Sequence, residues 1–188
     1  MSISVVYDAC VLYPAPLRDL LMHLAITDMY HAHWSEDIHA EWIRTAMRLR
    51  PDLPPENFHR VRQLMDENVR DCLVTGYQKL IRTLTLPDPD DRHVLAAAIR
   101  CHAQVIVTFN ERDFPKKEID VYGIEAQHPD AFVSNLFVID RATTLQAVKR
   151  HRASLRNPPF TPREYISKIR SQGLPIFASL LSEEIALI

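Results

Sequence analysis

The stretch ISVVYDACVL (residues 3–12) begins as an apolar run that favours β-structure and then places an aspartate, Asp8, where the run ends. Pro14 and Pro16 mark the loop that follows. Leucines at positions 17, 20, 21 and 24 then recur at the i, i+3, i+4, i+7 spacing of an amphipathic helix. A strand followed by a helix is the first unit of an alternating α/β pattern.

The alternation continues along the chain. Ser35 is expected to cap a helix over about residues 36–48, and PENFHRVRQLMDENV (55–69) predicts another. Asp88 and Pro89 begin a helix in DPDDRHVLAAAIRCHA (88–103). Strands are expected at QVIVTF (104–109) and VYGIEAQ (121–127). The first has the continuous β-branched run that is typical of a parallel sheet covered on both faces. A short extended piece is also expected near residues 80–86. We predict a three-layer α/β fold with a mostly parallel sheet between helices.

Residues 129–188 show only helical patterns. After the helix that HPDAFVSNLF opens, helical segments are expected at 140–155, 161–173 and 174–187, separated by RNPPF and GLP. The predicted organisation is an α/β domain at residues 1–128 and a small all-helical C-terminal extension at residues 129–188.

Composition excludes several classes of protein. With 188 residues and 47% hydrophobic content, the chain can form one sizeable core. Three glycines are too few for GxGxxG or GxxxxGK[ST] nucleotide loops, and three scattered cysteines argue against a disulfide framework or a thiolate zinc site. Nine histidines show no recognised zinc spacing. No run is long and apolar enough to span a bilayer and no signal segment is visible, so we expect a cytoplasmic protein.

Charge is unevenly distributed. The whole chain has a formal net charge of -2, but residues 141–170 hold eight basic residues and one acidic residue, a net charge of +7, which leaves -9 for the remainder. Either these basic residues attract an anionic partner, or they form ordinary solvated helix faces.

Four acidic residues stand where a parallel α/β fold would place a functional site. Asp8 and Asp113 follow strands, Glu41 lies on the edge of the apolar stripe of its helix, and Asp91 lies in a first helical turn beside Asp90. Each has an ordinary structural explanation when taken alone, such as a turn or a helix dipole. Together, such oxygen ligands suit Mg²⁺ or Mn²⁺, which can promote hydrolysis of a phosphodiester.

These segments resemble the PIN-domain nucleases, and in particular the VapC-type toxins of type II toxin–antitoxin pairs. The motifs are VVYDACVLYP, WSEDIHAEW, DPDDRHVLAAAI and VIVTFNERDFP followed by GIEAQHPDAF, within residues 3 to about 133. The resemblance implies a three-layer fold, a small antitoxin partner, a homodimer and a Mg²⁺- or Mn²⁺-dependent ribonuclease. By motif, Asp8, Glu41, Asp91 and Asp113 would be the acidic quartet that binds the metal, with Thr108 and Asn110 as polar residues beside it.

Three positions depart from the family pattern. Cys10 stands where asparagine is common, which weakens any role of that side chain in fixing Asp8. Asn110 stands where many members have aspartate, so the fourth acid is either Asp113 or missing. The pair Asp90 and Asp91 leaves the third acid open by one residue.

The function predicted from these features is metal-dependent endoribonuclease activity, with RNA attracted by Arg112, Lys116, Lys117, Arg150, Arg152 and Arg156. One alternative is a PIN-like module that binds RNA or protein without turnover, which Cys10 and Asn110 motivate. Another is a PIN ribonuclease that processes RNA outside any toxin system.

Overall fold

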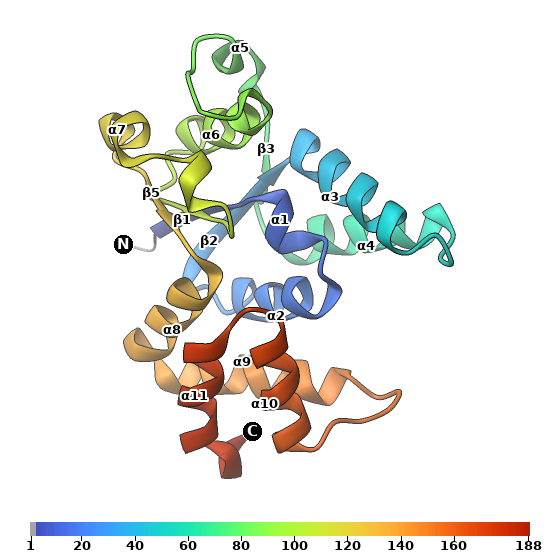
Figure 1. Cartoon of the computed structure of the whole chain (residues 1–188). Coiled ribbons are helices and arrows are strands. Elements are labelled where there is room, and N and C mark those ends of the chain that lie inside the picture. Colours follow the sequence, from blue (N-terminus) through green and yellow to red (C-terminus); the bar gives the residue numbers. More distant parts are fainter. Residues whose placement is uncertain (1–2) are drawn as a thin grey trace.

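The structure, a computed structural model, describes residues 3–188. The fold is built around one parallel sheet (Figure 1). The sheet has five strands in the order β3-β2-β1-β4-β5. The strands are β1 (Ile3–Tyr7), β2 (Tyr30–Ser35), β3 (Leu73–Val74), β4 (Val105–Val107) and β5 (Glu125–Gln127). Every pairing is parallel, so all five strands end at the same edge of the sheet.

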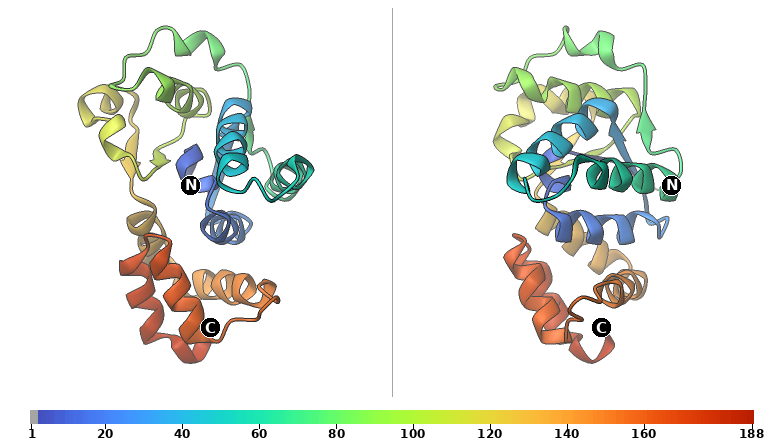
Figure 2. Two further views of the ribbon diagram at one scale, coloured as in Figure 1. Left: turned by 45° about the vertical axis from the view of Figure 1, so that its right-hand side comes forward. Right: turned by 90° about the vertical axis from the view of Figure 1, so that its right-hand side faces the viewer.

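Helices cover both faces of this sheet. In Figures 1 and 2, α6 lies on one side of it and α2 on the other, which gives the predicted three layers. The helices before residue 129 are α1 (Ala9–Leu12), α2 (Ala15–Ala25), α3 (Glu36–Leu49), α4 (Pro55–Asn68), α5 (Gln78–Ile81), α6 (Arg92–Arg100) and α7 (Lys116–Ile119), with single 3-10 turns η1 (Pro89–Asp91), η2 (Glu111–Asp113) and η3 (Asp120–Tyr122). The predicted α/β class is confirmed.

The sequence did not predict two of the strands. The six residues of β2 include two histidines, which interrupt its apolar pattern, yet β2 pairs with β1 along most of its length. β3 has only two residues. The extended piece expected near 80–86 is wrong, because α5 occupies 78–81 and no strand follows it there. Leu84 and Leu86 are buried, and this alternation imitates a strand.

The predicted helix starts at Ser35 and Asp88 are confirmed. The Ser35 hydroxyl accepts a hydrogen bond from the Ile38 N–H at 3.3 Å and begins α3. The Asp88 carboxylate accepts from the Asp90 N–H at 2.9 Å. Pro89 begins the η1 turn rather than α6 itself, which places Asp91 at the junction of the two.

The C-terminal part is helical, as predicted. It consists of α8 (Pro129–Ile139), α9 (Arg141–Ser154), α10 (Pro162–Ser171), α11 (Pro175–Glu183) and the turn η4 (Ile185–Leu187). α9 runs along α2, and α10 and α11 form a hairpin beside it (Figures 1 and 2). The division into domains at residue 128 stays a prediction. Within residues 3–188, none of the helices has the length and apolar character needed to span a bilayer.

Candidate active site

The carboxyl ends of β1 and β4 meet at the centre of the site. These two strands are neighbours, and the backbone N–H of Asp8 extends their pairing by donating to the Val107 carbonyl at 3.1 Å. The Asp8 side chain is only 2% exposed. The Thr108 hydroxyl donates to Asp8 Oδ2 at 2.7 Å and accepts from the Asn110 backbone N–H at 2.9 Å. Asp8 is therefore held from the neighbouring strand, and Asn110 contributes through its backbone.

Cys10 also holds Asp8, so the expectation that a cysteine here has a weaker role in fixing Asp8 is wrong. Its Sγ donates to Asp8 Oδ2 at 3.1 Å and accepts from the Phe109 N–H at 3.2 Å. Burial, together with the adjacent Asp8 charge, raises the pKa of the Cys10 thiol. The thiol therefore stays protonated and can donate, as an asparagine amide would.

The four predicted acids lie close enough to influence each other electrostatically. The pKa of Asp91 is raised to about 7, first by burial and then by the charges of Asp8, Asp88, Asp113 and Glu41. The pKa of Asp8 is also raised, mainly by burial and further by Glu41, although hydrogen bonds from Thr108 and Cys10 oppose the shift. We call Asp8, Glu41, Asp91 and Asp113 the acidic site.

Of the two adjacent aspartates, Asp91 is the one that belongs to this group. Asp90 is exposed, and its backbone N–H is used in the Asp88 cap. Asp91 is half-buried, with Asp8, Glu41 and Asp113 all acting on its carboxyl group.

Glu41 has a partner that the sequence did not reveal. His93 Nε2 lies 3.0 Å from Glu41 Oε2 and joins α6 to α3 beside the acidic site. The His93 side chain is 14% exposed. The signal in the sequence was its position two residues after Asp91, and that spacing alone does not tell which neighbour the ring meets.

Two family models match this chain, one over the α/β part that contains the acidic site and one over the helical extension. A family model described as PIN domain matches residues 4–112, more than half of the chain. The chain belongs to the PIN domain family. A second family model, described as VapC50 C-terminal domain, matches residues 129–183 of this PIN-domain protein. The predicted resemblance of residues 3 to about 133 to the PIN-domain family is therefore confirmed, and the helical extension matches a VapC-type family model as well.

The PIN-domain protein is also similar to a curated relative, "Putative ribonuclease VapC50" of Mycobacterium tuberculosis. The two are 36% identical over 104 residues, which is 55% of this chain and 60% of the relative. The match thus spans little more than half of the relative's length. No solved structure matches this chain.

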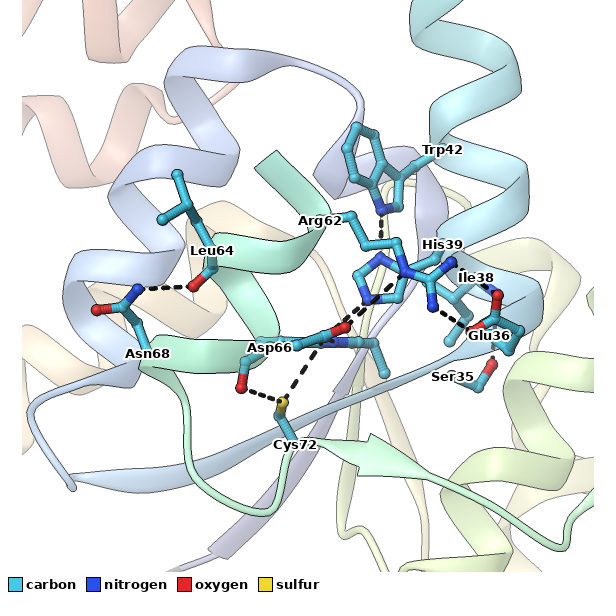
Figure 3. Close-up of polar contacts among 11 residues, drawn as sticks. Ser35, Glu36, Ile38, His39, Trp42, Arg62, Leu64, Asp66, Asn68 and Cys72 are labelled. Carbon is cyan, nitrogen blue, oxygen red and sulfur yellow. Dashed lines mark hydrogen bonds and ion pairs between the residues drawn. The ribbon is translucent and has the colours of Figure 1, made fainter. Parts of the chain in front are cut away.

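A buried polar network supports the helix of the PIN domain that carries Glu41 (Figure 3). Trp42 Nε1 donates to His39 Nδ1 at 2.9 Å, so the ring proton sits on Nε2, which donates to Asp66 at 2.9 Å. Trp34 Nε1 also donates to Asp66, at 2.7 Å. Burial lowers the pKa of His39, in keeping with a neutral ring. These contacts tie α3 to α4 and β2, and thereby fix where Glu41 lies between His39 and Trp42.

Two groups of basic residues were predicted to bind RNA. In the PIN domain, Arg112, Lys116 and Lys117 are exposed just after β4. Lys116 lies 3.8 Å from Asp120 and Lys117 lies 3.6 Å from Glu118. Such exposed ion pairs are weak, so both lysines remain free to bind another anion.

In the extension, the predicted basic residues differ in availability. Arg150 and Arg156 are exposed. Arg152 is half-buried, donates to the Phe160 carbonyl at 2.7 Å and has a buried Nε without a partner. Arg152 therefore holds the loop after α9 and has fewer donors left for RNA.

The donor set of the acidic site suits a hard divalent cation, because it supplies only carboxylate oxygens. The mutual effect of these acids on the pKa of Asp91 is the repulsion that a bound cation would relieve. Among residues 3–188, no three His, Cys, Asp or Glu side chains are grouped closely enough to hold an ion as they stand.

Proposed function

We propose that this PIN-domain protein is an endoribonuclease that requires Mg²⁺ or Mn²⁺, with Asp8, Glu41, Asp91 and Asp113 as the metal ligands. The observation that supports the proposal is that the charges of Asp8, Asp113 and Glu41, from three separate elements, all raise the pKa of Asp91 on a fourth. Like charges held together are costly unless a cation compensates them.

The residues around the acidic site have separate tasks in this proposal. A bound divalent cation would activate the attacking water and stabilise the leaving oxygen of the phosphodiester. Thr108 and Cys10 orient the Asp8 carboxylate, and His93 orients Glu41. These hydrogen bonds restrict the orientations of the Asp8 and Glu41 carboxylates before a substrate binds.

RNA as the substrate is supported by the name of the VapC50 relative and by exposed basic residues. Arg112, Lys116 and Lys117 lie next to Asp113 in the chain, and Arg150 and Arg156 extend the positive charge onto the extension. Phosphate contacts from such residues supply affinity without sequence preference. We expect cleavage within single-stranded loops, because the deep groove of A-form RNA is closed to side chains.

The VapC50 C-terminal match also supports a toxin role. In that role a small antitoxin would cover the acidic site, the enzyme would form a homodimer, and both proteins would act in the cytoplasm. Co-purification of a small DNA-binding protein encoded next to this one, and a dimer mass by light scattering, are the expected results. A protein that is active alone, with no such neighbour, would instead favour RNA processing outside a toxin system.

The test is cleavage of a mixed RNA pool with Mg²⁺ or Mn²⁺ by the wild type, Asp8→Asn, Asp91→Asn and Asp90→Asn. Removal of a ligand should lower the cleavage rate by about a thousandfold. Asp90→Asn is the matched control, because it removes a neighbouring exposed acid and should retain most activity.

Two outcomes would contradict the proposal. One is equal cleavage by the wild type and Asp8→Asn, and the other is no cleavage by the wild type with any divalent metal. Salt-dependent RNA binding without cleavage would instead support the alternative, a PIN-like module that binds RNA without turnover. Asn110 favours this alternative because it stands where many family members have an aspartate.

A further inference from the structure

The helical extension touches Phe109, in the segment after β4 that also leads to Asp113 of the acidic site. Gly173 lies in the turn between α10 and α11, with a φ of +82°. A Cβ atom added at Gly173 would lie 3.0 Å from Cε1 of Phe109, the residue after Thr108. This turn is at the end of the α10–α11 hairpin nearest the sheet (Figure 1). The backbone of the extension therefore lies directly against the Phe109 ring.

The Phe109 ring has a second neighbour in His128, the residue just before the extension. Its centroid is 5.1 Å from that of the His128 ring, in an edge-to-face arrangement. His128 caps α8 by accepting from the Asp130 N–H at 3.2 Å. The Asp130 carboxylate accepts from the N–H groups of Ile176 and Phe177, each at 2.9 Å. One buried aspartate thus fixes the start of α11 relative to α8, and with it the turn that contains Gly173.

Phe109 connects these contacts to Asp8. Its backbone N–H donates to Cys10 Sγ at 3.2 Å, and Cys10 in turn donates to Asp8 Oδ2 at 3.1 Å. The preceding residue, Thr108, donates to the same carboxylate oxygen at 2.7 Å. A shift of Phe109 would therefore move both groups that orient the Asp8 carboxylate.

We propose that Phe109 is a positioning residue through which the helical extension holds Asp8 in place. The inference rests on the proposed function for its effect on catalysis, but the mechanical link stands on the contacts alone. The extension is then part of the active-site scaffold, in addition to any role in binding RNA. Placement of this kind matters because a displacement of about 1 Å in an active site can lower a rate by about a hundredfold.

Gly173→Ala tests the link, and Gly123→Ala is its matched control. Gly123 also has a left-handed backbone, with a φ of +70°, but an added Cβ there meets nothing within 4 Å. Both variants impose the same kind of backbone strain. Only Gly173→Ala also pushes on Phe109.

The first measurement is the alkylation rate of Cys10 by N-ethylmaleimide, relative to that of Cys72, by peptide mass spectrometry. Cys72 is buried in the core and reports global unfolding. Gly173→Ala should raise the ratio of Cys10 to Cys72 labelling by about fivefold or more, since it weakens a local contact, and Gly123→Ala should leave the ratio unchanged.

The second measurement is RNA cleavage as a function of Mn²⁺ concentration. Gly173→Ala should raise the Mn²⁺ concentration required for half-maximal cleavage by about tenfold, as expected when a residue that supports a metal ligand is displaced.

In a Phe109→Ala background the added methyl group has room, so Gly173→Ala should change the ratio of Cys10 to Cys72 labelling no further. Phe109→Ala by itself should raise this ratio, and Phe109→Leu should raise it less.

Equal labelling ratios in Gly173→Ala and Gly123→Ala would overturn the proposal. If Gly173→Ala does not fold, an unchanged ratio in Phe109→Ala would overturn it equally. The labelling ratio does not depend on catalysis. A wild type without nuclease activity would therefore contradict the proposed function, while the labelling ratios would still decide whether the extension holds Asp8 in place through Phe109.

Discussion

Asp8 in the PIN domain and Asp130 in the extension are both nearly fully buried, at 2% and 4% exposure, but their surroundings are opposite. Asp130 accepts two backbone N–H groups at the start of α11, where the helix dipole also favours a negative charge. Asp8 accepts from a hydroxyl and a thiol, and faces Glu41 and Asp91. Burial of an acid alone therefore says little about function. Its neighbours distinguish a structural acid from a candidate metal ligand.

The largest expected effect on stability is at Asp130. Asp130→Ala leaves two N–H groups of α11 without their charged acceptor and should lower the free energy of unfolding by about 3 kcal/mol. Urea denaturation would measure the loss. Asp140→Ala is the control, because the Asp140 carboxylate accepts a backbone N–H at the start of α9 from a less buried position, so its loss should lower the free energy of unfolding by less. Equal losses would show that the burial of Asp130 adds nothing.

Acid should lower the stability of the folded chain, because His151 in the extension must become protonated while buried. This ring is buried between the hydroxyl of Tyr165, 2.9 Å from Nδ1, and the ring of His23, and its pKa is lowered to about 4, mainly by burial. The His151 ring therefore binds a proton more readily in the unfolded chain than in the folded protein. The stability from His151 is complete above about pH 6.5 and is lost as the pH falls toward 4, by about 2–3 kcal/mol.

Urea titrations at pH 4.5 and pH 7 would detect this loss. His151→Asn keeps a polar group near the position of Nδ1 without a titrating ring, so its stability should vary less between the two pH values. An unchanged pH dependence in this variant would contradict the assignment.

The acidic site should show the opposite trend. The folded pKa of Asp91, about 7, lies above its ordinary value of 3.8, so the folded protein binds the proton more tightly. The stability of the metal-free protein should therefore fall as the pH rises from about 4 to 7, by about 1–2 kcal/mol from Asp91 after solvent screening. Measured in a chelator, Asp91→Asn should remove this component and Asp90→Asn should not. Added Mn²⁺ should restore stability to the wild type at pH 7.

The smallest effect is expected at Cys10. Cys10→Asn can donate to Asp8 and accept from the Phe109 N–H, as the thiol does, so the cleavage rate should stay within about threefold of the wild type. Cys10→Ala loses both contacts and should lower the rate by about tenfold. A rate for Cys10→Ala equal to that of Cys10→Asn would show that neither contact matters.

Local patterns made much of this molecule predictable. Strands β1 and β4, the caps at Ser35 and Asp88 and the helical extension follow from features within a few residues of each other. Asp8, Glu41, Asp91 and Asp113 could be named because each stands at a strand end, a helix start or the edge of an apolar stripe. β2 was missed because His31 and His33 interrupt its apolar run; they lie on the less buried face of the strand, opposite Tyr30, Ala32 and Trp34.

What the sequence by itself determined is the α/β class with strands β1 and β4, the helical extension and the set of candidate acids, because backbone preference and apolar periodicity act over short distances along the chain. Only the tertiary structure decided that Asp91 rather than Asp90 joins Asp8, that His93 meets Glu41, and that Gly173 lies against Phe109. These contacts join residues far apart in sequence, such as Cys10 and Thr108. They exist because β1 and β4 are adjacent in the sheet and because Asp130 fixes the extension, neither of which any local pattern encodes.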